Sequence, residues 1–218
     1  MKKLIIQSLI AILLVVFFTE IDAACVKLGI SWTLSKIIPY VLLLTIGTIM
    51  TFEINSIHFK NAFYKVIAIL FGFSLPFAIG FYLHPIYEGD FSNNSEAIKK
   101  NLSPSDFTGT GLTVLTIPGC NFCFETIAIL KKIKKNNPKL KIDFVVCTTS
   151  KNNTKTYSKE IGGAFAVKLA KQPDQLAAMA NFSFPAFIYV EKNSPLTIWN
   201  NNSFGVRVFD ELKRKTTN

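Results

Sequence analysis

The sequence predicts an α/β domain, built as a central mixed sheet flanked by helices and preceded by an N-terminal membrane anchor of apolar helices. Half of the 218 residues are hydrophobic and only 17% are charged, whereas a soluble domain usually carries about 25% charged residues. The long apolar runs all lie within residues 1–83, and strand and helix patterns alternate beyond residue 107. The 20 Phe residues argue against disorder, and four cysteines are too few for a disulfide-dense scaffold.

Three apolar runs form the predicted anchor, at residues 4–18, 31–52 and 66–83. A membrane-spanning helix needs about 20 mainly apolar residues, and the second and third runs meet this requirement. The first run is shorter. It follows a Lys pair and precedes Ala23-Ala24, which is also the pattern of a signal peptide. Two interpretations therefore remain open for this run, a retained helix and a cleaved signal peptide.

Charges beside the runs predict the orientation of the chain. Lys2 and Lys3 precede the first run, and Lys60 and Lys65 lie between the second and the third. Cytoplasmic loops carry the excess of Lys and Arg, so both segments are expected inside and residues 84–218 outside the cytoplasm. That compartment is oxidising, and a cysteine pair can work there as a disulfide.

Residues 84–106 are polar and predict a linker with one short helix at 95–102, followed by a domain at 107–218. Strands are expected at 112–117, 141–147, 165–169, 186–190 and 195–199, and helices at 122–136, 156–161, 173–181 and 203–214. Strands that alternate with helices predict a βαβ unit with parallel strands. The last two strands, joined by the turn 191–194, are expected to be antiparallel.

The basic charge lies mainly in the C-terminal part, since residues 84–218 hold 18 basic and 11 acidic side chains. Such a surface favours acidic partners or anionic lipid. We interpret the densest run, Lys131 to Lys135, as the solvated face and C-terminal end of one helix. No nucleic-acid partner is expected.

Cys120 and Cys123 carry the predicted chemistry. They are separated by Asn121 and Phe122 and lie where a buried strand gives way to a helix. At the first turn of a helix this spacing brings the sulfurs within disulfide reach, and the helix N-terminus stabilises a thiolate on the first cysteine. Thiolate is the attacking species in thiol–disulfide exchange. The predicted catalytic residues are Cys120 as nucleophile and Cys123 as resolving thiol.

With these residues the chain resembles the thioredoxin-like family over about residues 107–215. The order of elements matches, and Phe184-Pro185, followed by the strand at 186–190, occupies the place of the family's cis-proline strand. The resemblance implies a thioredoxin-like fold and a cis peptide bond before Pro185. It also implies that Phe184 and Pro185 line the substrate groove, with Phe122 adding apolar contact surface.

The stretch between Cys147 and Pro185 is longer than in plain thioredoxin and looks like the central insertion of membrane-anchored, extracytoplasmic thioredoxins. Two positions depart from thioredoxin. Gly119 replaces the Trp before the first cysteine, and Val114 occupies the position of the family's buried acid. The nearest carboxylate, that of Glu125, we interpret as a solvated acid near the start of the helix.

The remaining cysteines and histidines bear on the alternatives. We expect Cys147, at the end of a strand, to be a structural core residue, and we expect no role for Cys25. A Cys pair can also hold Cu(I), so copper delivery stays open as an alternative, as does a non-catalytic binding module. A closed zinc site needs four ligands. His58 and His84 are the two histidines of the chain, so we do not expect a zinc site at the cysteine pair.

The sequence thus predicts a bacterial thiol-disulfide oxidoreductase in the inner membrane, with its thioredoxin-like domain in the periplasm or outside the cell. The expected partners are protein thiols and disulfides, together with a membrane electron donor if the reaction is reductive. No metal and no dissociable cofactor are expected, because the two thiols hold the electrons. The substrate and the direction of electron flow stay open.

Overall fold

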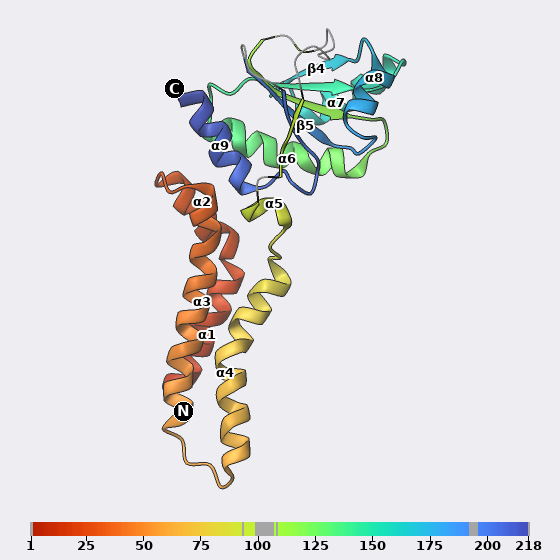
Figure 1. The fold of residues 1–218 in the computed structure, drawn as a ribbon. Coiled ribbons are helices and arrows are strands. Elements are labelled where there is room, and N and C mark those ends of the chain that lie inside the picture. The colour runs from red at the N-terminus through yellow and green to blue at the C-terminus, as the bar shows by residue number, and fades with distance from the viewer. Residues whose placement is uncertain (1, 93, 99–106, 108, 192–195, 218) are drawn as a thin grey trace. The chain divides into compact units, whose positions relative to one another are not determined.

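The computed structural model of the chain describes residues 2–92, 94–98, 107, 109–191 and 196–217. It divides into two compact units, Met1–Tyr87 and Glu88–Asn218 (Figure 1).

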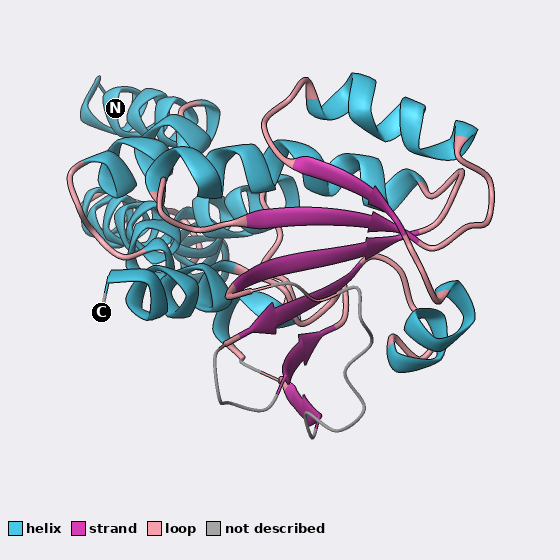
Figure 2. Ribbon diagram, turned by 90° about the horizontal axis from the view of Figure 1, so that it is seen from above, coloured by secondary structure: helices cyan, strands magenta, loops and turns pink. Residues whose placement is uncertain are grey.

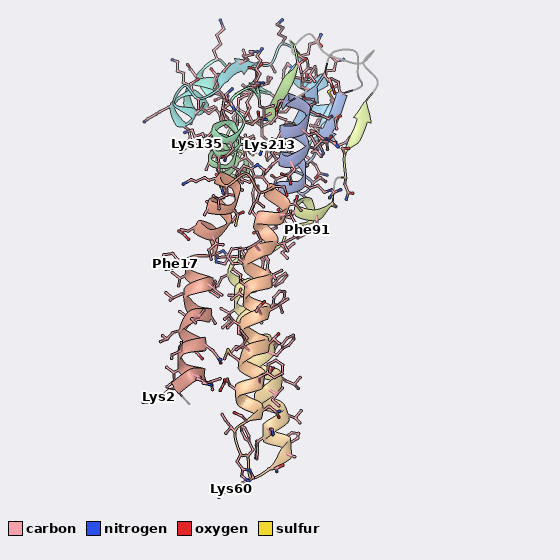
Figure 3. All side chains as sticks on the ribbon, turned by 90° about the vertical axis from the view of Figure 1, so that its left-hand side faces the viewer. Lys2, Phe17, Lys60, Phe91, Lys135 and Lys213 are labelled. Carbon is pink, nitrogen blue, oxygen red and sulfur yellow. A yellow bond between two sulfur atoms is a disulfide. The ribbon has the colours of Figure 1, made fainter. Side chains whose placement is uncertain are left out.

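The N-terminal unit is helical. Its elements are α1 (Lys2–Val16), α2 (Phe18–Lys27), α3 (Trp32–Asn55) and α4 (Ala62–Leu83). Polar side chains start the two long helices: Ser31 accepts a hydrogen bond from the Leu34 N–H before α3, and Asn61 accepts one from the Phe63 N–H before α4. Figure 3 shows the turn between α3 and α4 at Lys60.

Helices α3 and α4 are long and apolar enough to cross a membrane. The pair α1 and α2, bent by 65° at a short break, meets the same test when taken as one segment. Many apolar side chains of these helices are exposed, Leu70 and Phe71 among them at 60% each. The surfaces of α1, α3 and α4 are therefore largely apolar.

Helices α3 and α4 pack closely because glycines line their contact. A Cβ at Gly47 would collide with the backbone of Phe73 on α4, and Cβ atoms at Gly72 and Gly80 would collide with Ile54 and Leu43 on α3. Glycine thus brings the two backbones together, as small residues do in membrane helix pairs.

The first apolar run forms α1, which together with α2 is held against the other helices. Lys3 Nζ lies 3.6 Å from Glu53 Oε1 at one end of α3. At the other end, Ser35 Oγ donates a hydrogen bond to Asp22. Phe18 stacks on His84 with ring centroids 4.3 Å apart.

The C-terminal unit is built on a sheet whose described strands follow the order β1-β6-β5-β2-β3-β4 (Figure 2). The strands are β1 (Glu96–Ile98), β2 (Gly111–Thr116), β3 (Ile142–Val146), β4 (Ala166–Leu169), β5 (Ala186–Val190) and β6 (Leu196–Trp199). Strands β2, β3 and β4 are parallel to one another, while β5 and β6 pair antiparallel. The predicted βαβ unit and the antiparallel last pair are confirmed.

Both faces of the sheet are covered. The helices of this unit are α5 (Glu88–Phe91), α6 (Asn121–Asn136), α7 (Asn152–Ile161), α8 (Pro173–Met179) and α9 (Val206–Thr217). On one face, Phe144 lies against Tyr157 of α7, and Phe187 stacks on Phe204, whose ring meets Phe209 of α9. On the other face, Leu115 and Val145 pack in one buried cluster with Leu176 of α8.

Three predicted elements differ from the structure by more than two residues. The helix expected at 95–102 is wrong for Glu96–Ile98, which forms β1 and pairs antiparallel with β6; residues 99–102 lie outside the described part. Pairing with a strand one hundred residues away supplies the backbone hydrogen bonds that we had assigned to a local helix. Helix α7 begins at Asn152 rather than 156. The last helix runs over Val206–Thr217 rather than 203–214, because the Ser203 N–H bonds Asn200 Oδ1 in a turn.

Part of the segment 84–106, expected as a linker, belongs to the C-terminal unit. Besides contributing β1, it forms α5, which lies against the start of α9. The Gly89 N–H donates to Asn202 O at 2.8 Å, and a Cβ at Gly205 would collide with the backbone of Gly89 and Asp90. Backbone therefore packs directly on backbone at this point.

The two tryptophans of the chain are divided between the units. Trp32, at the start of α3, is 5% exposed, and Trp199, at the end of β6, is fully buried.

Candidate active site

The cysteine pair lies at the start of α6. Cys120 is the N-cap residue of this helix, and Cys123 lies in its first turn. The two form a disulfide, with an S–S distance of 2.07 Å and Cα atoms 5.2 Å apart. The predicted position of the pair, between a buried strand and a helix, is confirmed.

The two cysteines differ in exposure. Cys120 is half-buried, while Cys123 is fully buried. The Cys123 N–H donates to Cys120 Sγ at 3.1 Å. A backbone N–H at a helix N-terminus favours negative charge on the atom that it faces, so this contact stabilises a thiolate on Cys120 when the disulfide is open.

The backbone that connects β2 to Cys120 requires a glycine. Gly119 has φ +72°, in the left-handed region that other residues rarely adopt, and a Cβ there would meet nothing within 4 Å. A side chain would therefore fit at this position, but the positive φ angle favours glycine. Pro118 and Gly119 are both exposed, so this side of the pair is open where thioredoxin has a Trp.

Tyr157 holds the segment on both sides of the pair. Its hydroxyl donates to Ile117 O at 2.8 Å, and its ring stacks on that of Phe124 with centroids 4.5 Å apart. Burial raises the pKa of the Tyr157 phenol above its ordinary value, while a hydrogen bond with Thr116 acts in the opposite direction. Sequence reasoning missed this residue. Its one signal was an aromatic residue in a short polar helix.

The peptide bond between Phe184 and Pro185 is cis, as the resemblance implied. Strand β5 begins at Ala186, which faces Leu115 of β2 in antiparallel register. One step further along this register, Pro185 faces the end of β2 that leads into Cys120. Pro185 has no N–H to continue the ladder. The fold is thioredoxin-like.

Aromatic residues lie on two segments at this end of the thioredoxin-like sheet. Phe122, between the cysteines, is 61% exposed. Phe184 is half-buried and packs on the core cluster, and Pro185 is buried. Within the described residues, no ring contact joins Phe122 to Phe184. Sequence reasoning also missed Phe182, which is 74% exposed at φ +54° on the loop before Phe184.

The other residues considered from the sequence take no part in the disulfide. Cys147 directly follows β3, donates its N–H to Thr116 O at 2.7 Å and packs partly against the core. Cys25 lies on α2 of the N-terminal unit. Val114 is fully buried, and Glu125 is exposed. Within the described ranges, no three His, Cys, Asp or Glu side chains gather as metal ligands would.

No protein-family model matches the sequence, and a search of curated proteins gives no significant match. Solved structures with a similar fold include a secreted Mycobacterium tuberculosis disulfide oxidoreductase homologous to E. coli DsbE (18% identity, 56% of this chain and 92% of that one, TM-score 0.39). DsbF from the same organism matches at 18% identity over 50% and 79% of the chains, with TM-score 0.38. A thioredoxin-like protein from Bacteroides caccae matches at 12% identity over 84% and 83%, with TM-score 0.28.

Proposed function

We propose that the chain is a membrane-anchored thiol-disulfide oxidoreductase that acts on protein disulfides outside the cytoplasm. One observation carries the proposal: a half-exposed Cys120 caps α6 and is bonded to a fully buried Cys123. An outer sulfur that substrates can reach and an inner sulfur that they cannot reach are what a nucleophile and a resolving thiol require.

In the reductive direction the Cys120 thiolate attacks one sulfur of a substrate disulfide. The Cys120–substrate bond forms, the substrate S–S bond breaks, and the other substrate sulfur leaves as a thiolate. Cys123 loses its proton and attacks Cys120 Sγ, which restores the Cys120–Cys123 disulfide and releases the second substrate thiolate. Two electrons pass from the cysteine pair to the substrate, and the oxidative direction is the reverse of these steps.

The residues around the pair suit an extended polypeptide substrate. Phe122, exposed between the cysteines, offers apolar contact area. Phe184 and Pro185 enter β5 beside the end of β2, so we assign to them the wall of a substrate groove. Gly119, exposed and without a side chain, leaves access to Cys120 Sγ from the β2 side.

The N-terminal unit serves as the anchor in this proposal. Helices α3 and α4 are the proposed spans, and the Lys residues before α1 and between α3 and α4 favour the cytoplasmic side for those segments. The thioredoxin-like unit then faces the periplasm or exterior from a bacterial inner membrane. A reductive role further requires a membrane protein that returns two electrons to the cysteine pair.

The test uses the full chain in lipid nanodiscs. The protein is equilibrated across a series of glutathione ratios, its thiols are trapped by alkylation, and the peptides are weighed. We expect a reversible two-electron transition confined to Cys120 and Cys123. A midpoint near about −270 mV would indicate a reductase and one near about −120 mV an oxidase. Cys123→Ser is expected to accumulate a mixed disulfide on Cys120.

Cys25→Ser and Cys147→Ser are the matched controls and should leave the midpoint unchanged. A pair that does not exchange with glutathione would contradict the proposal. So would thiols protected by bound Cu(I), which would indicate metal delivery instead.

A further inference from the structure

Helices α6 and α9 end side by side in the C-terminal unit. Asn137, the C-cap residue of α6, is 9% exposed. Its amide Nδ2 donates to Thr216 Oγ1 at 2.7 Å and lies 3.5 Å from Leu212 O. Figure 3 shows Lys135 and Lys213 at this junction. A buried amide that bonds the other helix fixes the two helix ends relative to each other.

This junction concentrates positive charge. We call its basic residues the basic end: Lys132, Lys135, Lys139, Lys213 and Arg214. All are exposed except Lys213, which is half-buried. Residues 126–142 contain no acidic residue. The acids nearby on α9 are Asp210, one turn before Arg214, and Glu211, which lies 3.2 Å from Lys215. The basic end therefore keeps a net positive charge.

An apolar residue adjoins these charges. Ile129 is 46% exposed and lies one turn before Lys132 on the outer face of α6. A helix face that combines lysines with an exposed aliphatic residue suits the boundary between lipid headgroups and acyl chains.

The connection between the two units is short. On the anchor side, Ile86 packs against the helix cluster of Val15 and Tyr40, and Lys36 Nζ lies 5.6 Å from the centre of the Tyr87 ring. On the other side, Gly89 bonds Asn202 within the C-terminal unit. Two residue steps separate Tyr87 from Gly89, a span of at most about 7.6 Å.

The basic end lies within reach of this attachment point. Gly89 contacts the loop that begins α9, and the 12 residues of α9 extend about 18 Å to the basic end, at about 1.5 Å per residue. If α4 crosses the membrane, the short connection and the length of α9 tether the basic end within roughly 30 Å of Tyr87, so the unit can turn to bring it to the headgroup layer. Attraction to an anionic surface acts within about 8–10 Å at ordinary ionic strength.

We propose that the basic end binds the anionic lipid headgroups of the membrane in which the chain is anchored. The proposal rests on the membrane anchoring proposed above and is independent of the redox chemistry. Cys120 lies at the opposite end of α6, so lipid binding leaves the disulfide uncovered. It would direct the pair toward disulfides held close to the membrane surface.

The test uses the full chain in nanodiscs of phosphatidylcholine alone and in nanodiscs that also contain phosphatidylglycerol. Lysines are acetylated briefly, and the extent at each site is measured by mass spectrometry. We expect Lys132, Lys135 and Lys139 to react several-fold more slowly in the anionic nanodiscs, and high salt to remove the difference. The exposed lysines Lys151, which precedes α7, and Lys155 and Lys159 of α7 serve as internal references and should react equally in both.

Two matched variants separate lipid binding from a change in fold. The first carries Lys132→Gln, Lys135→Gln, Lys139→Gln and Arg214→Gln; the second carries Lys151→Gln, Lys155→Gln, Lys159→Gln and Lys171→Gln. Lys213 remains in both as a reporter. We expect its protection by anionic lipid to be lost in the first variant and kept in the second.

Equal acetylation of the basic end in the two lipid compositions would overturn the proposal, as would loss of Lys213 protection in both variants. Redox titration of the same samples tests the cysteine pair separately. A failure of lipid binding with an intact two-electron transition, or the reverse, therefore identifies which proposal is wrong.

Discussion

The two units differ in how many large apolar side chains they expose. In the N-terminal unit such residues cover the helices, and Leu70 and Phe71 are typical at 60% exposure. In the described part of the C-terminal unit they are few. They are Phe91, Phe122 between the cysteines, Phe182 on the loop before Phe184, and Ile129 beside the basic end. Exposure of a large apolar residue is therefore ordinary in the first unit and rare in the described part of the second.

The burial of a side chain must therefore be judged against the solvent that surrounds its unit. In water, a leucine gains free energy by entering a core. In lipid the surroundings are as apolar as the side chain, and close packing has to hold helices together instead.

The largest contrast is expected between two Leu→Ala substitutions. Leu130 of α6 is fully buried, and Leu130→Ala should destabilise the C-terminal unit by about 2–5 kcal/mol through lost burial and a cavity. Leu70→Ala removes the same atoms from an exposed site on α4 and should cost less than about 0.6 kcal/mol in lipid. Native-state hydrogen exchange of the full chain in nanodiscs, read by mass spectrometry, measures both. Costs of about 2–5 kcal/mol at both sites would mean that Leu70 packs against protein and is not exposed to lipid.

A smaller effect is expected where glycine permits contact with backbone. In Gly47→Ala the new methyl group meets the Phe73 carbonyl on α4, and in Gly205→Ala it meets the Gly89 carbonyl on α5. Each substitution should cost about 1–3 kcal/mol, because backbone cannot move aside as a side chain end can. Circular dichroism in increasing urea measures the loss.

Hydrogen exchange should place the two losses in different units. Gly47→Ala should loosen α3 and α4 alone, and Gly205→Ala should loosen α5 and the start of α9 alone. Exchange that rises in both units for either variant would contradict the independence of their packing.

The smallest effect concerns Tyr157 and depends on pH. Its pKa is raised in the folded chain above the ordinary 10.0, so the unfolded state loses this proton first as the pH rises. The contribution of the protonated Tyr157 phenol to the stability of the fold is therefore present below pH 10 and is lost above it. Tyr157→Phe should cost about 0.5–1.5 kcal/mol near neutrality, through the lost bond to Ile117 O. Above pH 10 the wild-type chain should lose part of this advantage.

Urea midpoints at pH 8 and above pH 10 test this prediction. Tyr189, whose pKa burial also raises, stays in both proteins and supplies the common background. We expect the difference in urea midpoint between wild type and variant to shrink above pH 10. A difference that grows with pH would contradict the prediction.

Local patterns predicted most of the sheet and the cysteine pair. The run at 112–117 and the helix at 122–136 match β2 and α6 within one residue at each end, because burial on both strand faces and an apolar helix stripe are visible in neighbouring residues. Pro185 was placed by resemblance, since nothing in the local sequence determines the isomer of its peptide bond.

What the sequence left hidden depends on contacts between distant segments. The three residues of β1 carry no strand pattern of their own and are ordered by β6. Tyr157 becomes part of the site because α7 lies beside the chain at Ile117, about forty residues away. The lysine run was interpreted correctly as a helix end, yet only the bond from Asn137 to Thr216 reveals a second basic helix end beside it.

The division of the two tryptophans gives each unit its own optical signal. Indole emission shifts to the red when water reaches the ring, and Trp32 and Trp199 are both buried, one in each unit. Replacing Trp32 by Phe leaves an emission that reports the thioredoxin-like unit alone, and replacing Trp199 by Phe leaves one that reports the helices alone. The unfolding of each unit can thus be followed separately in the intact chain by fluorescence.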